Sequence, residues 1–302
     1  MSTSRIVSVF GATGLQGAAV VHALLEDGTF SPRAIVRNPE CDAALKLKAA
    51  GADVVTGDWL DKASLVSALS GSEAVFALTF PVFGPGQTQV DQGKHLIDAA
   101  KEVGVKFFVF TSLPSIAEVS GGKYKSCVHY DQKAEVDAYL RTSGLANASL
   151  FLGAFLENYW KFDLLKKTAT GFDVAVPNYS ATDRQAFTWV EHDVPAATLA
   201  LLKNYTDPSK KVSGKSYPIV NATISYTELA AMTAKALGVE VTFTSAPPMG
   251  IPPVDEMYAA LAEYSGLYTA TPVPNPDLTA LGMKFGTIEE FLETVVKPRF
   301  GQ

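Results

Sequence analysis

Cysteine is scarce in this chain of 302 residues, which has two, Cys41 and Cys127, and neither stands in a C-x-x-C pair. Two cysteines cannot build the disulfide framework of a small secreted domain, so a reduced compartment, the cytoplasm, is expected. Histidine is sparse as well, and the four histidines show no spacing typical of metal ligands. We therefore expect no bound metal.

Long apolar runs are also missing. None approaches the roughly 20 residues that a membrane-spanning helix needs, and Met1–Arg5 leads into the first apolar segment without a signal peptide. Basic residues are outnumbered, with 25 Lys and Arg against 31 Asp and Glu, a net charge of −6, and basic runs no longer than pairs such as Lys166-Lys167. This balance argues against a nucleic-acid surface, and we expect neither a nucleic acid nor a membrane as partner.

The first half of the chain shows a regular alternation of strand and helix patterns. Apolar runs predict strands at 5–10, 32–37, 53–56, 74–78, 106–111 and 148–152, with helical patterns between them at 14–27, 41–50, 62–69, 88–103 and 130–143. Strands that alternate with helices imply parallel pairing with right-handed crossovers. The sequence therefore predicts an α/β fold with a Rossmann-type doubly wound sheet over residues 1–152.

The alternation becomes irregular after about residue 152. This change indicates a second, smaller α+β domain over residues 153–302, which would serve a substrate or a partner. The segment at about 186–203 is expected to pack back on the first domain.

Local signals place several elements of this second part. The aromatic-rich stretch Phe155–Lys167 predicts a helix, and Asp193 is placed to cap an apolar helix over 194–202. Ser225 and Glu228 form a capping-box pattern, which predicts a helix from there to Leu237.

A glycine-rich turn, Phe10-Gly-Ala-Thr-Gly-Leu-Gln-Gly17, joins the first predicted strand to the first predicted helix. Gly11 would allow a sharp turn, Gly14 a close approach of backbone N–H groups to a pyrophosphate, and Gly17 tight packing of helix on sheet. The anion would lie on the helix N-terminus. The spacing G-x-x-G-x-x-G departs by one residue from G-x-G-x-x-G, and small residues in such a turn also serve packing alone.

Arg37 ends the second predicted strand, 20 residues beyond Gly17. At this point of a dinucleotide fold an acid binds the 2′-hydroxyl of NAD, whereas an arginine accommodates the 2′-phosphate of NADP. The planar donor fork of Arg37 therefore favours NADP(H), the alternative being a solvated surface arginine. Asp58 follows the third strand and would accept from the adenine amino group, or cap the next helix, a role better suited to Asp61.

Polar side chains also follow the fourth and fifth strands. Thr79, Thr111 and Ser112 fall at the sheet edge where a nicotinamide pocket would lie, although a strand-end turn explains Thr111 and Ser112 equally well. Lys133 begins the next helix, and His129 precedes it by one turn on the same face. A lysine whose pKa is lowered by burial can bind the ribose hydroxyls and relay a proton, the alternative being a solvated lysine.

With the glycine turn, Arg37-Asn-Pro39, Gly57-Asp58 and His129-x-x-x-Lys133 in register, the chain resembles the NmrA-like family of atypical short-chain dehydrogenase/reductases, and its N-terminal half is similar to the NADP(H) redox-sensor members. The resemblance extends over essentially the full length, including Phe155-Leu-Glu-Asn158 and Trp189–Asp193. The cofactor contacts expected from the resemblance and from the strand ends together are Gly11, Thr13, Gly14, Leu15, Gln16, Gly17, Arg37, Asp58, Thr79, Lys133, Phe155 and Asn158.

The chain departs from the superfamily pattern Tyr-x-x-x-Lys. His129 occupies the position of the tyrosine, and Tyr130 is displaced by one residue, about 100° around a helix. The resemblance implies both reductases that use the lysine without the tyrosine and proteins that bind NADP(H) and regulate partners without established turnover.

Two functions follow from this split. The first is an NADPH-dependent reductase of a small apolar carbonyl, quinone, enone or imine, with Lys133 and His129 as catalytic residues. The second is a catalytically silent NADPH/NADP redox sensor that acts on a regulatory protein partner, in the nucleus if it is a regulator, with loops 80–90 and 112–128 ordering on binding. Self-association as a homodimer is left open.

Aromatic side chains favour the reductase, because ligand pockets are commonly apolar. The candidate lining residues, which would serve equally well as core, are Phe80, Phe83, Phe155, Tyr159, Trp160 and Tyr258.

Overall fold

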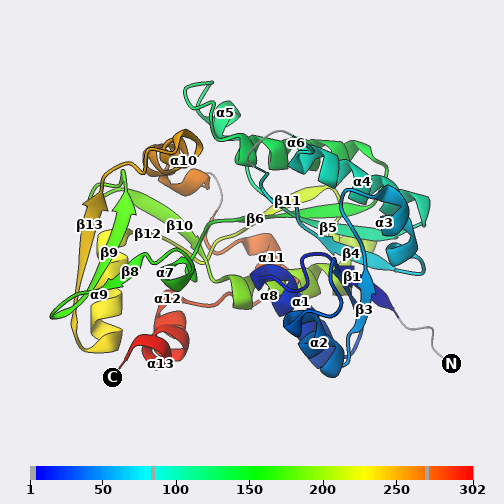
Figure 1. Cartoon of the computed structure of the whole chain (residues 1–302), viewed down its shortest axis with the longest axis horizontal. Helices are drawn as coiled ribbons and strands as arrows, with labels where there is room; N and C mark the ends of the chain where they lie inside the picture. Colours follow the sequence, from blue (N-terminus) through cyan, green and yellow to red (C-terminus); the bar gives the residue numbers. More distant parts are fainter. Residues whose placement is uncertain (1–4, 83–85, 269–271, 302) are drawn as a thin grey trace.

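The computed structural model describes residues 5–82, 86–268 and 272–301. Within these ranges a larger lobe built on a seven-stranded sheet lies beside a smaller lobe with two three-stranded sheets (Figure 1). Phe83 of the predicted lining and residues Met1–Ser4 lie outside the described residues.

The larger lobe has the predicted doubly wound sheet. Its strands are β1 (Ile6–Val9), β2 (Ser31–Val36), β3 (Asp53–Thr56), β4 (Ala74–Ala77), β5 (Phe107–Ser112), β6 (Asn147–Leu152) and β11 (Lys215–Ile219). They follow the order β11-β6-β5-β4-β1-β2-β3, and every neighbouring pair is parallel. The prediction of an α/β fold with a Rossmann-type sheet is confirmed, and β11 adds a strand from the second half of the chain.

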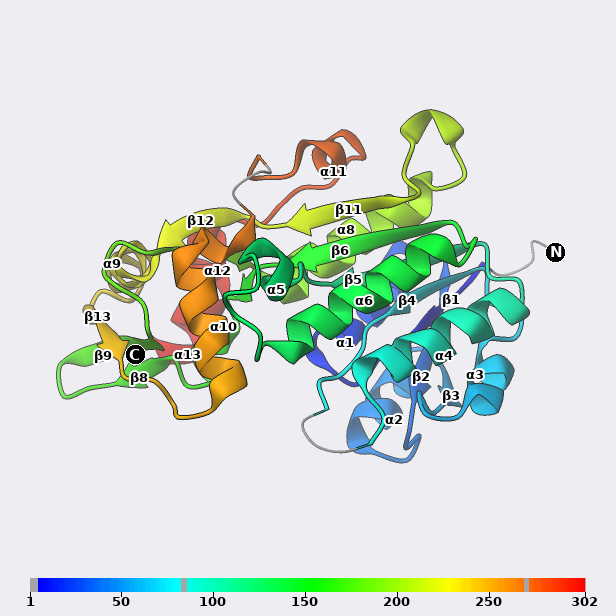
Figure 2. The same cartoon turned by 90° about the horizontal axis from the view of Figure 1, so that it is seen from above.

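Helices cover both faces of this sheet. One face carries α1 (Leu15–Asp27), α2 (Asp42–Ala49) and α8 (Val190–Asn204), and the other carries α3 (Lys62–Leu69), α4 (Gln89–Glu102) and α6 (Val128–Thr142). Figure 2 shows α4 and α6 side by side on their face. In β4, Ala74 and Phe76 face the first group while Val75 and Ala77 face the second, so the strand is apolar throughout.

The smaller lobe has its own core, which includes Leu156, Val174, Tyr226 and Phe291. Its elements are β7 (Ala154–Phe155), α7 (Asn158–Lys161), β8 (Leu165–Lys167), β9 (Gly171–Pro177), β10 (Arg184–Thr188), β12 (Ala222–Ser225), α9 (Tyr226–Leu237), β13 (Glu240–Ala246), α10 (Pro252–Glu263), α12 (Ile288–Phe291) and α13 (Lys297–Phe300). Its sheets run β12-β10-β7 and β13-β9-β8. Because α8 and β11 return to the larger lobe, the chain passes between the lobes several times, and the division at residue 152 stays a prediction.

The helix predicted over Phe155–Lys167 is wrong. The stretch divides into β7, the short α7 and β8. Phe155 pairs with Thr188 of β10, and Leu165 pairs with Val174 of β9. These strand partners lie later in the chain, so tertiary pairing overrides the local pattern.

Helix starts were predicted with mixed success. Ser225 and Glu228 form the predicted capping box of α9, and Asp61 caps α3 by accepting from the amide of Ala63. The cap assigned to Asp193 is wrong, because α8 begins at Val190 and Asp193 lies inside its first turn.

Candidate functional site

The glycine turn brings the start of α1 onto the end of β1. Gly11 has a φ of +64°, and its carbonyl accepts from the amide of Gly14 at 2.8 Å. A Cβ on Gly17 would lie 2.3 Å from the carbonyl oxygen of Gly11 and 2.8 Å from the amide nitrogen of Ala12. Position 17 therefore admits no side chain, as the dinucleotide interpretation requires.

The N-terminus of α1 suits an anion. Its N-cap is Gly14, no side chain caps it, and its first turn carries no acidic residue. Thr13 is exposed beside it, and Leu15 and Gln16 are half-buried. The Oε1 atom of Gln16 is buried and has no hydrogen-bond partner within the described ranges.

The Oδ1 atom of Asn158, at the start of α7, is buried and equally unpartnered among the residues that the structure describes. Buried polar atoms without partners are costly, and a polar ligand would satisfy them. These orphaned atoms and the glycine cradle fit a dinucleotide.

Arg37 lies exposed at the end of β2, and none of the described carboxylates forms an ion pair with it. Its guanidinium carbon lies 5.6 Å from the ring centroid of Trp59, a residue that sequence reasoning did not single out. Asp58 is also exposed, and its Oδ1 accepts from the amide of Leu60 at 3.0 Å. One carboxylate oxygen of Asp58 thus shapes the turn after β3, and its contact to adenine stays a prediction.

Lys133 lies at the carboxyl end of β4. Its Nζ donates to the carbonyl of Thr79 at 2.8 Å and to Oγ1 of Thr79 at 3.1 Å. Thr79 in turn donates to Gln89, and Gln89 Nε2 donates to the carbonyl of His129 at 3.0 Å. Burial of the ammonium lowers the pKa of Lys133 to about 7, which suits a group that exchanges a proton at neutral pH.

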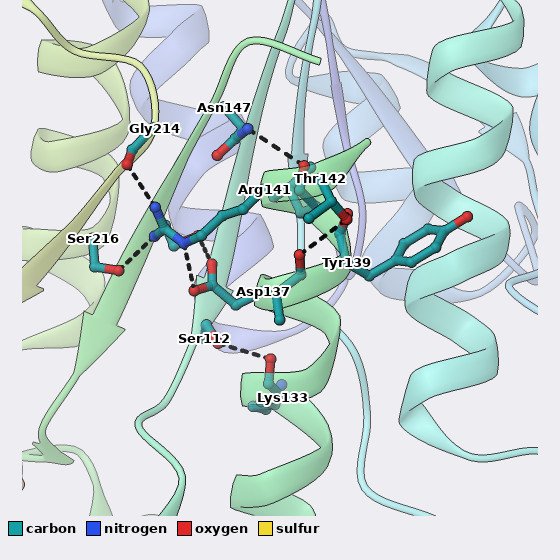
Figure 3. Close-up of polar contacts among 12 residues, drawn as sticks. Ser112, Lys133, Asp137, Tyr139, Arg141, Thr142, Asn147, Gly214 and Ser216 are labelled. Atoms are coloured by element: carbon teal, nitrogen blue, oxygen red, sulfur yellow. Dashed lines mark hydrogen bonds and ion pairs between the residues drawn. The ribbon is translucent and has the colours of Figure 1, made fainter. Parts of the chain in front are cut away.

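Further contacts near both ends of α6 hold this helix in place. Near the site, Ser112 donates to the carbonyl of Lys133 at 3.0 Å, so Ser112 supports the helix (Figure 3). Thr111 is buried beside Ser112 in β5. At the far end, Asp137 accepts from Arg141 at 3.0 Å, and Arg141 reaches the segment around β11 (Figure 3). These contacts hold α6, and with it Lys133, against β5 and β11.

His129 and Lys133 lie one turn apart on α6, as predicted. Burial, followed by the charge of Lys133, lowers the pKa of His129, so its neutral form dominates at pH 7. Tyr130 instead packs against the cluster of Ile116, Cys127 and Ala260, and burial raises its pKa. Tyr130 therefore belongs to this cluster and takes no part in the contact between Lys133 and Thr79.

Glu157, between Phe155 and Asn158, was quoted only as part of a motif. It is fully buried, and its Oε1 accepts from the amide of Glu191 in the first turn of α8 at 2.9 Å. Burial raises its pKa to about 7. Glu157 therefore ties the segment with the two predicted nicotinamide contacts to α8.

The predicted aromatic lining divides between separate places. Tyr159 is buried with its hydroxyl on Thr233, and Trp160 stacks on Phe291, so both belong to the core of the smaller lobe. Tyr258 packs on Tyr179 in the same lobe. Phe80 contacts the ring of Trp59 at the edge of the large sheet, and Phe155 packs against the core beneath that sheet.

A surface groove of about 680 Å³ runs between α1 and α8. Thr13, Gly14 and Leu15 form part of its wall, and Lys133 does not. The groove thus adjoins the glycine turn from the side of α8.

The described part of the chain contains no group of three or more His, Cys, Asp or Glu side chains that could hold a metal ion. It also contains no helix long and apolar enough to span a membrane.

Comparison with known proteins gives a match over most of the chain. The profile of the NmrA-like family matches residues 3–292. The NmrA-like family domain-containing oxidoreductase lnaB of Aspergillus flavus is 37% identical over 163 residues, which are 51% of this chain and 48% of that protein. The oxidoreductase notA of Aspergillus sp. is 43% identical over 146 residues, 46% of this chain and 43% of that protein. The aligned region thus spans about half the length of these curated relatives.

Solved structures share the fold. NmrA, a negative transcriptional regulator solved in complex with NADP, superimposes with a TM-score of 0.81 at 20% identity, over 99% of this chain and 97% of that one. The NADPH-dependent quinone oxidoreductase QOR2 of Escherichia coli, complexed with NADPH, gives 0.73 at 24% identity, over 96% of this chain and 99% of that one. At such low identity these matches show the fold.

Proposed function

Because the chain belongs to the NmrA-like family, we propose that it is an NADP(H)-dependent oxidoreductase that reduces a small apolar carbonyl, quinone, enone or imine. The observation that carries this proposal is the Lys133 ammonium, held on Thr79 at the carboxyl edge of the sheet with its pKa lowered to about 7. The names of lnaB and notA as oxidoreductases, and the NADPH bound to QOR2, support it.

The cofactor would lie along the carboxyl edge of the sheet. The pyrophosphate would lie on the N-terminus of α1, where Gly14 is the N-cap and no side chain caps the helix, while Gly17 allows α1 to approach the backbone of Gly11. Arg37 would bind the 2′-phosphate. The nicotinamide end would meet Thr79, Lys133, Phe155 and Asn158, where Oδ1 of Asn158, which has no partner among the described residues, would accept a hydrogen bond.

When bound, a reduced nicotinamide would supply a hydride, that is, one proton with two electrons, to the substrate. Lys133, or the minor protonated form of His129 through a water molecule, gives one proton to the substrate oxygen or nitrogen, which completes the reduction. Lys133 is left neutral, the form that its buried surroundings favour, and it takes a new proton from solvent. Burial of Lys133 therefore favours the transfer of its proton to the substrate.

The test follows the loss of reduced-nicotinamide absorbance against a panel of quinones, enones and imines. Lys133→Met should lower turnover by about 10²-fold or more, the usual contribution of a positioned proton donor. Lys101→Met, on an exposed position of α4, is the matched control and should leave turnover unchanged. Full turnover in Lys133→Met would contradict the proposed role.

One observation favours the sensor as a second candidate. His129 stands where a tyrosine would complete the acid/base pair, and Tyr130 is held in the cluster with Ile116 and Cys127. A sensor needs different affinities for its ligand in two conformations. NADPH binding without turnover, with altered protease sensitivity of segment 112–128 and altered partner binding, would favour this candidate over the reductase.

A further inference from the structure

Trp59 occupies the place where the strands of the adenosine half end. Its ring has the Arg37 guanidinium at 5.6 Å, the ring of Phe80 edge-on at 5.1 Å and the ring of Phe10 at 6.3 Å. Trp59 is thus enclosed between two aromatic side chains with a cation over its ring. Such an arrangement restricts the indole and presents it to the arginine as a fixed surface.

The backbone on both sides of Trp59 is also held. Its carbonyl accepts from Nδ1 of His95 on α4 at 3.0 Å. Asp58 before it donates its amide to Ser64 at 2.8 Å, and Leu60 after it donates to Asp58. The position of the indole is therefore set by the turn and by α4, independently of Arg37.

Arg37, by contrast, has little else to orient it. It is exposed, and no ion pair to a carboxylate is formed in the part of the chain that the structure describes. An arginine side chain has considerable rotamer entropy, which a ring beneath the guanidinium reduces before any ligand arrives. A cation–π contact engages none of the N–H donors of Arg37 in a hydrogen bond, so they stay available for phosphate oxygens.

A second feature of Trp59 points to a ligand at this place. Its indole Nε1 is buried and lacks a hydrogen-bond partner anywhere in the described ranges. A buried donor without an acceptor is costly, and an acceptor atom on a bound nucleotide would relieve that cost.

We propose that Trp59 is the positioning residue for cofactor selectivity: it holds Arg37 in place for the 2′-phosphate, so that NADP(H) is preferred over NAD(H). This inference rests on the proposed NADP(H) function. It assigns to the turn after β3 a role in distinguishing two cofactors that differ by one phosphate.

The experiment measures the dissociation constants of NADPH and NADH for the full chain and its variants. Trp59→Leu should reduce the preference for NADPH by about two- to five-fold, the range expected for an exposed cation–π contact. Trp59→Phe, which keeps an aromatic face, should retain most of the preference. In an Arg37→Gln background, Trp59→Leu should leave the remaining ratio unchanged, because the effect passes through the arginine.

The smaller lobe offers a matched control. Arg299 lies 4.3 Å from the ring of Trp160, a similar pair far from Arg37 in sequence. Trp160→Leu should leave the ratio of the two dissociation constants unchanged. Phe80→Leu, at an exposed side chain that abuts Trp59, is the second variant if Trp59→Leu does not fold, and it should shift the ratio in the same direction.

The outcomes separate the two proposals. An unchanged ratio in folded Trp59→Leu or Phe80→Leu, or an equal change with and without Arg37, would overturn the role of Trp59 while leaving NADP(H) binding intact. If the wild-type chain binds neither nucleotide, the proposed function fails and this inference fails with it.

Discussion

Gly17 shows how one missing side chain shapes the candidate site. A methyl group there would meet the backbone of Gly11 and Ala12 at less than van der Waals distance. Backbone atoms cannot rotate away as a flexible side chain would, so the turn itself must move. The dinucleotide interpretation of the glycine turn therefore depends on this position more than on the others.

We predict that Gly17→Ala destabilises the protein by about 1–3 kcal/mol, the usual cost of overpacking, and weakens NADPH binding. Thermal melting and a nucleotide titration measure the two effects. Ala19→Ser, on the half-buried side of the same helix, serves as control. If Gly17→Ala had the melting temperature and the NADPH affinity of wild type, a Cβ at position 17 would fit in the turn, and this prediction would be wrong.

Lys133 gives a prediction about pH. Only its ammonium form carries the proton, and with a pKa of about 7 that form is lost as the pH rises above neutrality. Turnover limited by proton transfer should therefore fall as pH rises through about 7. Lys133→Arg stays protonated over the whole range, so it should react more slowly and lose this step from the profile of kcat against pH. If kcat of Lys133→Arg fell over the same pH range as kcat of wild type, the titrating group would be another residue.

At the scale of elements, α8 receives its N-terminal cap from a different part of the chain. A carboxylate oxygen of Glu157 accepts from the amide of Glu191, whereas the side chain of the N-cap residue Trp189 makes no capping hydrogen bond. This contact joins α8 to the start of α7, where Asn158 lies. Burial raises the pKa of Glu157 to about 7, which links the stability of this junction to pH.

The direction of this pH dependence follows from the pH at which Glu157 releases its proton in the folded and in the unfolded protein. An unfolded glutamate releases it near pH 4.3, whereas folded Glu157 keeps it to about pH 7, so folding stability falls as pH rises between these values. Glu157→Gln stays neutral and still accepts through its amide oxygen. Its melting temperature relative to wild type should therefore increase from about pH 5 to about pH 7.5 and then level off.

Glu289→Gln, an exposed change on α12, is the control for this series and should follow the wild-type curve. A difference between Glu157→Gln and wild type that stays constant with pH would show that Glu157 does not titrate in this window.

Elements whose signals are local were predictable. The capping box of Ser225 and Glu228 and the cap of Asp61 involve neighbours in sequence, and both were found where the sequence indicated. The segment Phe155–Lys167 was not predictable in this way, because its strands exist only by pairing with β10 and β9. Asp193 was misassigned for a similar reason, since two of its partners, Asn221 and Gly286, come from other segments.

At the scale of the molecule, Asp193 joins distant parts of the chain. It is fully buried and accepts from the amides of Trp189 and Gly286, from Asn221 and from His192. These residues lie at the start of α8, after β11 and before α12, where the chain passes between the lobes. One carboxylate thus satisfies donors from three segments.

Removing this carboxylate should loosen the junction. Asp193→Ala leaves several buried donors unsatisfied, and we expect a loss of about 3 kcal/mol in the free energy of unfolding. Asp193→Asn, which keeps one acceptor oxygen, should lose less. Chemical denaturation of the three proteins measures the difference. Equal stability of Asp193→Ala and wild type would contradict the role of Asp193 at the junction.

The architecture and the site differ in how far the sequence alone predicts them. Alternating apolar patterns imply parallel strands, and parallel strands place Gly11, Arg37, Asp58 and Thr79 at one edge of the sheet. The contacts between residues of the site could not be predicted in this way. Lys133 and Thr79 are 54 residues apart in sequence, and only the packing of α6 on β4 and β5 brings them into contact. Trp59 and Glu157 were overlooked for the same reason.

Titration calorimetry with NADPH and NADH, on wild type and on Arg37→Gln, tests whether this chain binds NADP(H) and selects it through Arg37. We predict one nucleotide per chain, tighter binding of NADPH than of NADH, and loss of that preference in Arg37→Gln. No heat with either nucleotide, or equal affinity of wild type for both, would contradict this prediction.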